Sequence, residues 1–113
     1  MEYNRIIALG LGDSLQVDLL DLSNYKSKNK GYRYILLVVD VYSRYAFARK
    51  LKAKNARAVP DAFADILEEL ALPVNSIVSD KGTEFLNAPF QRSVKDRNIK
   101  HFTKRPGTHT ATD

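Results

Sequence analysis

The sequence predicts an α/β fold in which a mixed five-stranded sheet carries flanking helices. Three observations predict it. Short apolar runs typical of strands recur along the chain, amphipathic helical segments lie between the later runs, and 113 residues with 44% hydrophobic side chains suit one compact domain with a core. The expected order is strand, strand, strand, helix, strand, helix, strand, which calls for helices packed on a mixed sheet.

The first three strands are predicted from their apolar patterns. Residues 14–22 are apolar on both parities, which is typical of a central strand with both faces covered. Residues 32–43 form the most strand-like run, and 45–51 alternate as a strand with one wet face does. Because the second and third runs are joined so tightly, they are expected to form an antiparallel hairpin.

A helical period follows these strands. Val59, Phe63, Ile66, Leu67 and Leu70 recur at helical spacing. Because a proline is tolerated only in the first turn of a helix, the helix is expected to begin at Pro60 and to run to residue 71.

The remaining elements follow a return to strand chemistry. Residues 72–80 are expected to form a strand and 99–103 a last short one. Between them, 83–98 is expected to be one helix with Phe90 and Val94 facing inward. A crossover through the first helix would place the 73–79 strand parallel to the first strand and beside it.

Composition narrows the chemistry. The net charge of +5 and the pI near 9.5 favour a polyanionic partner, although many ordinary soluble domains share this bias. The absence of cysteine excludes disulfides and thiolate zinc sites, so a metal would be held by oxygen, as Mg²⁺ or Mn²⁺ is. No apolar run is long enough for a membrane span, so no membrane association is expected.

Two aspartates are the candidate metal ligands. Asp80 ends an apolar run before Lys81 and Gly82, where it could form a turn or bind a metal. An unpaired carboxylate at Asp18 would be costly in a central strand unless it reaches solvent or a lysine. If the crossover brings the two acids about 4 to 5 Å apart, their repulsion is roughly 3 to 4 kcal/mol at an effective dielectric near 20, and a divalent cation relieves it.

Three segments carry a family resemblance. "LQVDLLDLS", "GYRYILLVVDVYSRYAFARKLK" and "IVSDKGTEF", in this order, resemble the catalytic core of retroviral-type integrases, most closely those of Maverick/Polinton elements. The resemblance spans about 12–103 and implies an RNase H-like fold, with one acid on the first strand and another after the fourth. It implies that Asp18 and Asp80 are the first two members of an Asp, Asp, Glu metal triad.

The resemblance also implies a third acid that this sequence does not reach. The Glu would fall near position 116, and residue 113 is the last one here. Residues 1–113 are therefore expected to form a single integrase core domain truncated at the C-terminus, without its final helices. Asp113 could substitute for the Glu, but a chain terminus is a poor place for a rigid ligand.

Other polar residues have structural interpretations. Asp40 interrupts an apolar strand and is assigned to structure, and Asp21 has the wrong parity to share a face with Asp18. His101 and His109 are expected to contact solvent or backbone rather than a metal. Lys81 and Glu84 could touch DNA or simply form a surface turn.

A basic segment near the end of the chain is the candidate DNA contact. It holds six cations against the single acid Asp96: Arg92, Lys95, Arg97, Lys100, Lys104 and Arg105. Lys100, Lys104 and Arg105 are expected to bind phosphates, with a solvated helix flank as the alternative.

The leading functional hypothesis is a DNA integrase or transposase core. It would hydrolyse phosphodiesters and transfer DNA strands with Mg²⁺ or Mn²⁺, as a homo-oligomer in the nucleus or cytoplasm of a host cell or in a viral particle. An RNase H-like nuclease would share the fold and acids but only hydrolyse. A noncatalytic nucleic-acid-binding or assembly module is the third hypothesis.

Overall fold

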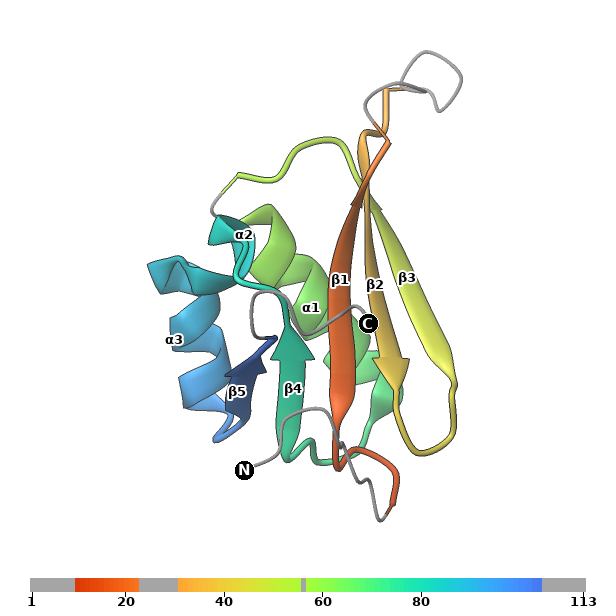
Figure 1. The fold of residues 1–113 in the computed structure, drawn as a ribbon. Coiled ribbons are helices and arrows are strands. Elements are labelled where there is room, and N and C mark those ends of the chain that lie inside the picture. The colour runs from red at the N-terminus through yellow and green to blue at the C-terminus, as the bar shows by residue number, and fades with distance from the viewer. Residues whose placement is uncertain (1–9, 23–30, 56, 105–113) are drawn as a thin grey trace.

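The computed structural model describes residues 10–22, 31–55 and 57–104, and within them the chain forms five strands and three helices (Figure 1). The strands are β1 (Leu15–Asp21), β2 (Tyr34–Asp40), β3 (Ala46–Leu51), β4 (Ser76–Ser79) and β5 (Lys100–Thr103). The helices are α1 (Ala58–Leu70), α2 (Thr83–Leu86) and α3 (Ala88–Asp96). None of these helices combines the length and apolar character needed to cross a bilayer.

The strands form one mixed sheet in the order β3-β2-β1-β4-β5. β1, β2 and β3 pair antiparallel, whereas β4 lies parallel to both β1 and β5. The predicted hairpin and the predicted parallel crossover through α1 are therefore both confirmed. The α/β fold with a mixed five-stranded sheet and flanking helices is confirmed with them.

The core lies between the helices and one face of the sheet. Leu15, Val17, Leu36 and Val38 are fully buried there against Phe63 and its neighbours on α1. Each fully buried side chain of this size contributes roughly 1.5 to 3 kcal/mol by leaving water. Three phenylalanine rings join the helices, with centroids 5.3 Å apart in each adjacent pair: Phe63, Phe90 and Phe85.

The other face of the sheet carries no helix of the described residues. In β1, Leu15 and Val17 are buried, but Gln16 and Asp18 between and beyond them are partly exposed, and α1 and α3 lie on one side of the sheet (Figure 1). The expectation that both faces of this strand are covered is wrong for the described part of the chain. We call the helix-free side the open face, and by strand alternation and register it carries Gln16, Asp18, Leu20, Ile35, Leu37, Val39, Ala48, Lys50, Lys100 and Phe102.

The first helix begins at Ala58, two residues before the predicted start. The side-chain oxygen of Asn55 accepts hydrogen bonds from the backbone nitrogens of Arg57 (3.1 Å) and Ala58 (2.9 Å), so the first turn forms ahead of the proline. Pro60 then stands where a helix needs no backbone N–H.

The single helix expected over 83–98 is wrong, since the chain forms α2 and α3 with a break at Asn87. Pro89 cannot donate the hydrogen bond that a continuous helix would give to the carbonyl of Phe85. That carbonyl accepts instead from the Gln91 side chain at 2.7 Å, and the Asn87 side chain caps α3 by accepting from the nitrogen of Phe90 at 3.0 Å. Phe90 and Val94 are buried as predicted.

Candidate active site

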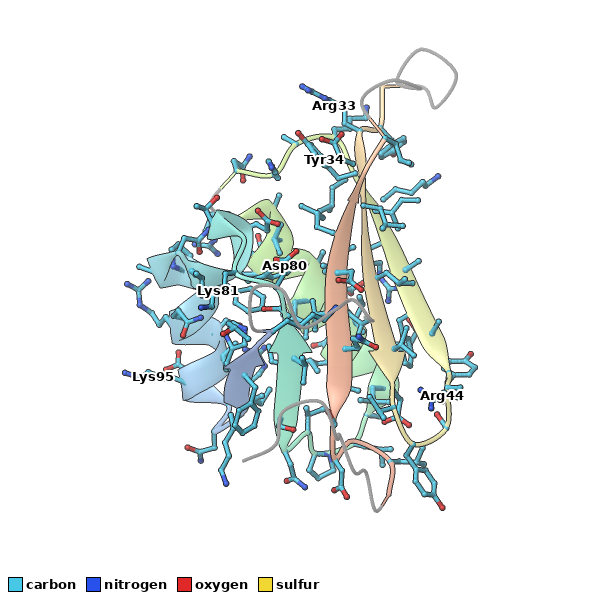
Figure 2. All side chains as sticks on the ribbon, viewed as in Figure 1. Arg33, Tyr34, Arg44, Asp80, Lys81 and Lys95 are labelled. Atoms are coloured by element: carbon cyan, nitrogen blue, oxygen red, sulfur yellow. The ribbon has the colours of Figure 1, made fainter. Side chains whose placement is uncertain are left out.

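Strand register brings Asp18 and Asp80 level with each other. β1 and β4 pair with Leu15 opposite Ile77 and Gln16 opposite Val78, and this register, continued two residues beyond the pairing, would set Asp18 opposite Asp80. Neighbouring strands are about 4.8 Å apart. Since Val17 and Ser79 point into the core, both aspartates lie on the open face, and Asp80 follows the end of β4 (Figure 2).

Asp80 takes part in a turn without using its whole carboxylate. Its Oδ1 accepts a hydrogen bond from the backbone nitrogen of Gly82 at 2.8 Å, as a turn-forming aspartate does. A carboxylate has about four lone-pair directions, and the Asp80 side chain is exposed. The turn-forming and metal-binding interpretations of this residue are therefore compatible.

Gly82 leaves space between two carboxylates. A Cβ at this position would lie 2.5 Å from Oε2 of Glu84 and 3.0 Å from Oδ1 of Asp80. The backbone of Gly82 has an ordinary φ of −64°, so glycine is needed there for room rather than for conformational freedom. DNA contact and a surface turn were the two alternatives for Glu84. Its side chain is 13% exposed, and its Oε1 lies 4.0 Å from Nζ of Lys54.

Lys104 lies within the candidate site. Its backbone nitrogen extends the pairing of β5 with β4 by donating to the Ser79 carbonyl at 2.8 Å, and its Nζ lies 3.8 Å from Oδ1 of Asp18. A partly exposed pair of this kind stabilises the fold by about 0 to 1 kcal/mol. The predicted phosphate contact thus neutralises a candidate ligand, while Lys100 is exposed on β5 and Arg105 lies outside the described residues.

The donor set fits a hard divalent cation. Asp18 and Asp80 offer carboxylate oxygens, the ligands that Mg²⁺ and Mn²⁺ take, and Mg²⁺ commonly uses one or two carboxylates together with waters and substrate phosphates. Within residues 10–22, 31–55 and 57–104, no three His, Cys, Asp or Glu side chains group closely enough to hold a metal. The pair therefore fits as part of an open oxygen site rather than a closed protein cage.

A chain of hydrogen bonds through Gln91, His101 and Ser79, which we call the relay, holds the backbone beside Asp80. Gln91 Nε2 lies 2.7 Å from the Phe85 carbonyl and 2.9 Å from Nδ1 of His101. Nε2 of His101 in turn lies 2.7 Å from Oγ of Ser79, and that Oγ lies 2.8 Å from the Asp80 carbonyl. An amide nitrogen can only donate, so Nδ1 accepts and Nε2 carries the proton. Every group then has a partner, with Nε2 donating to Ser79 and Ser79 donating to Asp80.

The environment of His101 favours this neutral form. Burial lowers the pKa of the His101 imidazole below its ordinary value, and its ring packs edge-on against Phe90 with centroids 5.8 Å apart. The expectation of solvent or backbone partners for His101 is wrong, because its partners are the side chains of Ser79 and Gln91. His109 lies outside the described residues.

Asp40 and Asp21 stand apart from the candidate pair. Asp40 is 1% exposed and accepts from the nitrogens of Gly12 and Ser43 and from the Ser43 hydroxyl, which supports its structural assignment. Asp21 is three residues from Asp18 on β1 and therefore points to the other face of the strand.

Sequence reasoning missed two features of this region. One is the contact of Lys104 with Asp18, for which no local pattern gives a signal because the residues are far apart in the chain. The other is a basic group at the end of β3, where Lys50, Lys52 and Lys54 alternate along the chain in "KLKAK". Lysine at every second position was a usable signal for a concentration of positive charge at this end of β3.

The order of the five strands and the helices on one face of the sheet form an RNase H-like α/β fold. Residues 12–109 match the family model of the integrase core domain, and this chain belongs to that family. A transposon-derived protein of Caenorhabditis elegans is 36% identical over 81 residues, which cover 72% of this chain. The matched region spans 27% of that relative's length.

Proposed function

We propose that this chain is the catalytic core of a DNA integrase or transposase that uses a divalent metal to hydrolyse phosphodiesters and to transfer DNA strands. The observation that supports it is the parallel pairing of β1 with β4, whose register directs Asp18 and Asp80 toward each other on the open face, in a chain of the integrase core family. Two carboxylates at one strand spacing repel each other, and a divalent cation offsets that repulsion.

Each acid has a role in this proposal. Asp18 and Asp80 would hold Mg²⁺ or Mn²⁺, and Gly82 keeps the space beside Asp80 open. When bound, the metal supplies charge stabilisation to the attacking and leaving oxygens of the phosphodiester. The relay through Gln91, His101 and Ser79 orients the backbone of Asp80. Within residues 10–22, 31–55 and 57–104, no third acidic side chain joins this pair to complete an Asp, Asp, Glu triad.

Metal titration tests this proposal directly. Calorimetric titration of residues 1–113 with Mn²⁺ should show binding that is lost in Asp18→Asn and in Asp80→Asn. Asp21→Asn, on the same strand but the opposite face, is the matched control and should bind as the wild type does. Unchanged Mn²⁺ binding in both site variants would contradict the proposal.

Strand transfer provides a second test. Residues 1–113 should join DNA weakly at most, because the described residues offer two carboxylates at the candidate site and no group of three. Strong metal-dependent joining by residues 1–113, abolished by Asp80→Asn, would show that the third ligand lies within this sequence.

Lys104 favours one alternative, a noncatalytic nucleic-acid-binding or assembly module. Its ammonium, 3.8 Å from Asp18, already neutralises one acid without a metal. In the catalytic proposal Lys104 competes with the cation, so Lys104→Ala should raise Mn²⁺ affinity. In a noncatalytic module, Lys104→Ala creates no Mn²⁺ site.

The finer parts of the proposal follow from the resemblance of the sequence segments. They are an element of the Maverick/Polinton type or a related virus, a homo-oligomeric assembly, and a place in the host nucleus or cytoplasm or in a viral particle. Lys100, Lys104 and Arg105 remain proposed DNA contacts, of which Lys100 lies on the open face with the acids.

A further inference from the structure

We propose that the β3 end of the open face is a second contact surface for DNA, where Lys50 and Lys52 bind the phosphate backbone of a duplex. We call Tyr32, Lys50 and Lys52 the basic-aromatic cluster. The inference rests on the proposed function, since it says where the DNA of that site would run, and the arrangement of cations around Tyr32 carries it.

An aromatic ring holds both ammonium groups of the cluster. Nζ of Lys50 lies 4.8 Å and Nζ of Lys52 lies 5.2 Å from the centroid of the Tyr32 ring. A cation over a ring is attracted by the quadrupole but keeps its full charge. Both positive charges are thus held beside one ring and remain available to an anion.

The neighbouring Arg49 shows the opposite arrangement. Its guanidinium donates to Asp65 at 2.7 Å and to Glu69 at 2.5 Å, and these carboxylates raise its pKa. Two acids therefore neutralise Arg49, on the helix side of β3. Both lysines of the cluster are exposed, whereas Asp21 lies in the row of Tyr34 and Leu51, two strands away from β3, and points to the helix side of the sheet.

The register relates the cluster to the candidate ligands. Asp18, Leu37 and Ala48 lie in one row across β1, β2 and β3, and the row two residues further along ends at Lys50. Two strand spacings and two residues of rise separate the α carbons of Asp18 and Lys50 by about 12 Å on the same face. A DNA strand rises about 3.4 Å per phosphate, so a few nucleotides span that distance.

Charge therefore lies on both sides of the acids. Lys100 and Lys104 come from β5 on one side of Asp18 and Asp80, and Lys50 and Lys52 come from the β3 end on the other. A duplex that crosses the open face would meet cations before and after the acids. Such contacts position the backbone and carry no base specificity.

Salt-dependent binding of a mixed-sequence 20-base-pair DNA duplex to residues 1–113 tests the inference. The double variant Lys50→Ala, Lys52→Ala should lower the slope of log affinity against log salt by about 2, at roughly 0.9 per phosphate contact. The matched control is Arg92→Ala with Lys95→Ala, which removes the same charge from exposed positions of α3, and it should leave the slope unchanged. An unchanged slope in the cluster variant, or equal losses in both variants, would overturn the inference.

Substitution of Tyr32 provides a second, independent test of the proposed DNA surface. Tyr32→Leu keeps both charges but removes the ring, so affinity should fall a few-fold while the salt slope stays the same. Tyr32→Phe keeps the ring and should bind as the wild type does. Equal binding by Tyr32→Leu and the wild type would remove the role of the ring.

Titration with Mn²⁺ separates this inference from the proposed function. If the Lys50→Ala, Lys52→Ala variant binds Mn²⁺ normally and its DNA affinity depends on salt as in the wild type, the proposed DNA surface is wrong and the proposed metal site stands. If Asp18→Asn and Asp80→Asn leave Mn²⁺ binding unchanged while the DNA affinity of the lysine variant becomes less dependent on salt, the proposed metal site is wrong and the proposed DNA surface stands.

Discussion

Asp40 and Asp80 each follow an apolar run, at opposite ends of the sheet, but the two carboxylates differ in burial and in hydrogen bonding. Asp40 is 1% exposed, and its carboxylate accepts from Gly12 N at 3.0 Å, from Ser43 N at 2.8 Å and from Ser43 Oγ at 2.7 Å. Asp80 is exposed, and its carboxylate accepts from the nitrogen of Gly82. At Asp80 the relay of side chains holds the backbone carbonyl instead.

The difference separates a structural acid from a candidate ligand. Both oxygens of the Asp40 carboxylate accept hydrogen bonds from the protein. Glycine is required at the donor Gly12, because its φ is +81° and a Cβ there would collide with the Pro73 carbonyl. Burial acts to raise the pKa of Asp40, but the hydrogen bonds from Gly12 and Ser43 outweigh it and hold that pKa below its ordinary value. A carboxylate with its backbone held and its oxygens exposed can bind an outside partner.

The largest expected effect is on Asp40. Asp40→Ala should lower the free energy of unfolding by about 3 kcal/mol, because it removes three hydrogen bonds to a charge and leaves buried donors unpaired. Urea unfolding followed by circular dichroism measures it. Asp80→Ala is the matched comparison, and equal losses in the two variants would break the distinction between them.

Part of that energy depends on pH. Because the folded pKa of Asp40 lies below the unfolded value of about 3.9, the unfolded chain takes up the proton first. The stabilisation is present above about pH 4 and is lost as the pH falls through the folded pKa. Urea midpoints between pH 3 and 7 should fall less steeply in acid for Asp40→Asn than for the wild type, and parallel curves would contradict this account.

The relay beside Asp80 should have an intermediate effect. Ser79→Ala removes the fully buried hydroxyl between His101 and the Asp80 carbonyl, and should cost about 1 to 2 kcal/mol of unfolding free energy. A double-mutant cycle with His101→Phe should show non-additive losses, since both changes break one chain of hydrogen bonds. Additive losses would mean that the relay is not continuous.

The smallest effect on stability belongs to Gly82. Its φ of −64° suits alanine, and the atoms that a Cβ would meet are the ends of two side chains, so Gly82→Ala should change the unfolding free energy by less than about 0.5 kcal/mol. The displaced carboxylates should nevertheless weaken Mn²⁺ binding at least tenfold, measured by calorimetry. Wild-type Mn²⁺ affinity in this variant would mean that the space beside Asp80 has no role in binding.

Local pattern was enough for much of the fold. Apolar patterning predicted five strands and the helix that buries Phe63. Pro89, a blemish near the start of the helix predicted over 83–98, marks the break before α3. The crossover rule predicted that β4 lies parallel to β1. These features depend on residues close together in the chain, or on the handedness of a single connection, and so can be read from a window of sequence.

Tertiary structure alone decided which distant groups surround each acid. "VVD" and "VSD" look alike as sequence, but one oxygen of Asp40 accepts from Gly12, 28 residues away, whereas Asp80 lies on the helix-free face with Asp18, 62 residues away. Lys104 reaches Asp18 only because β5 pairs with β4. The state of a carboxylate depends on which donors and charges fold around it, and those contacts join residues whose distance along the chain leaves no local pattern.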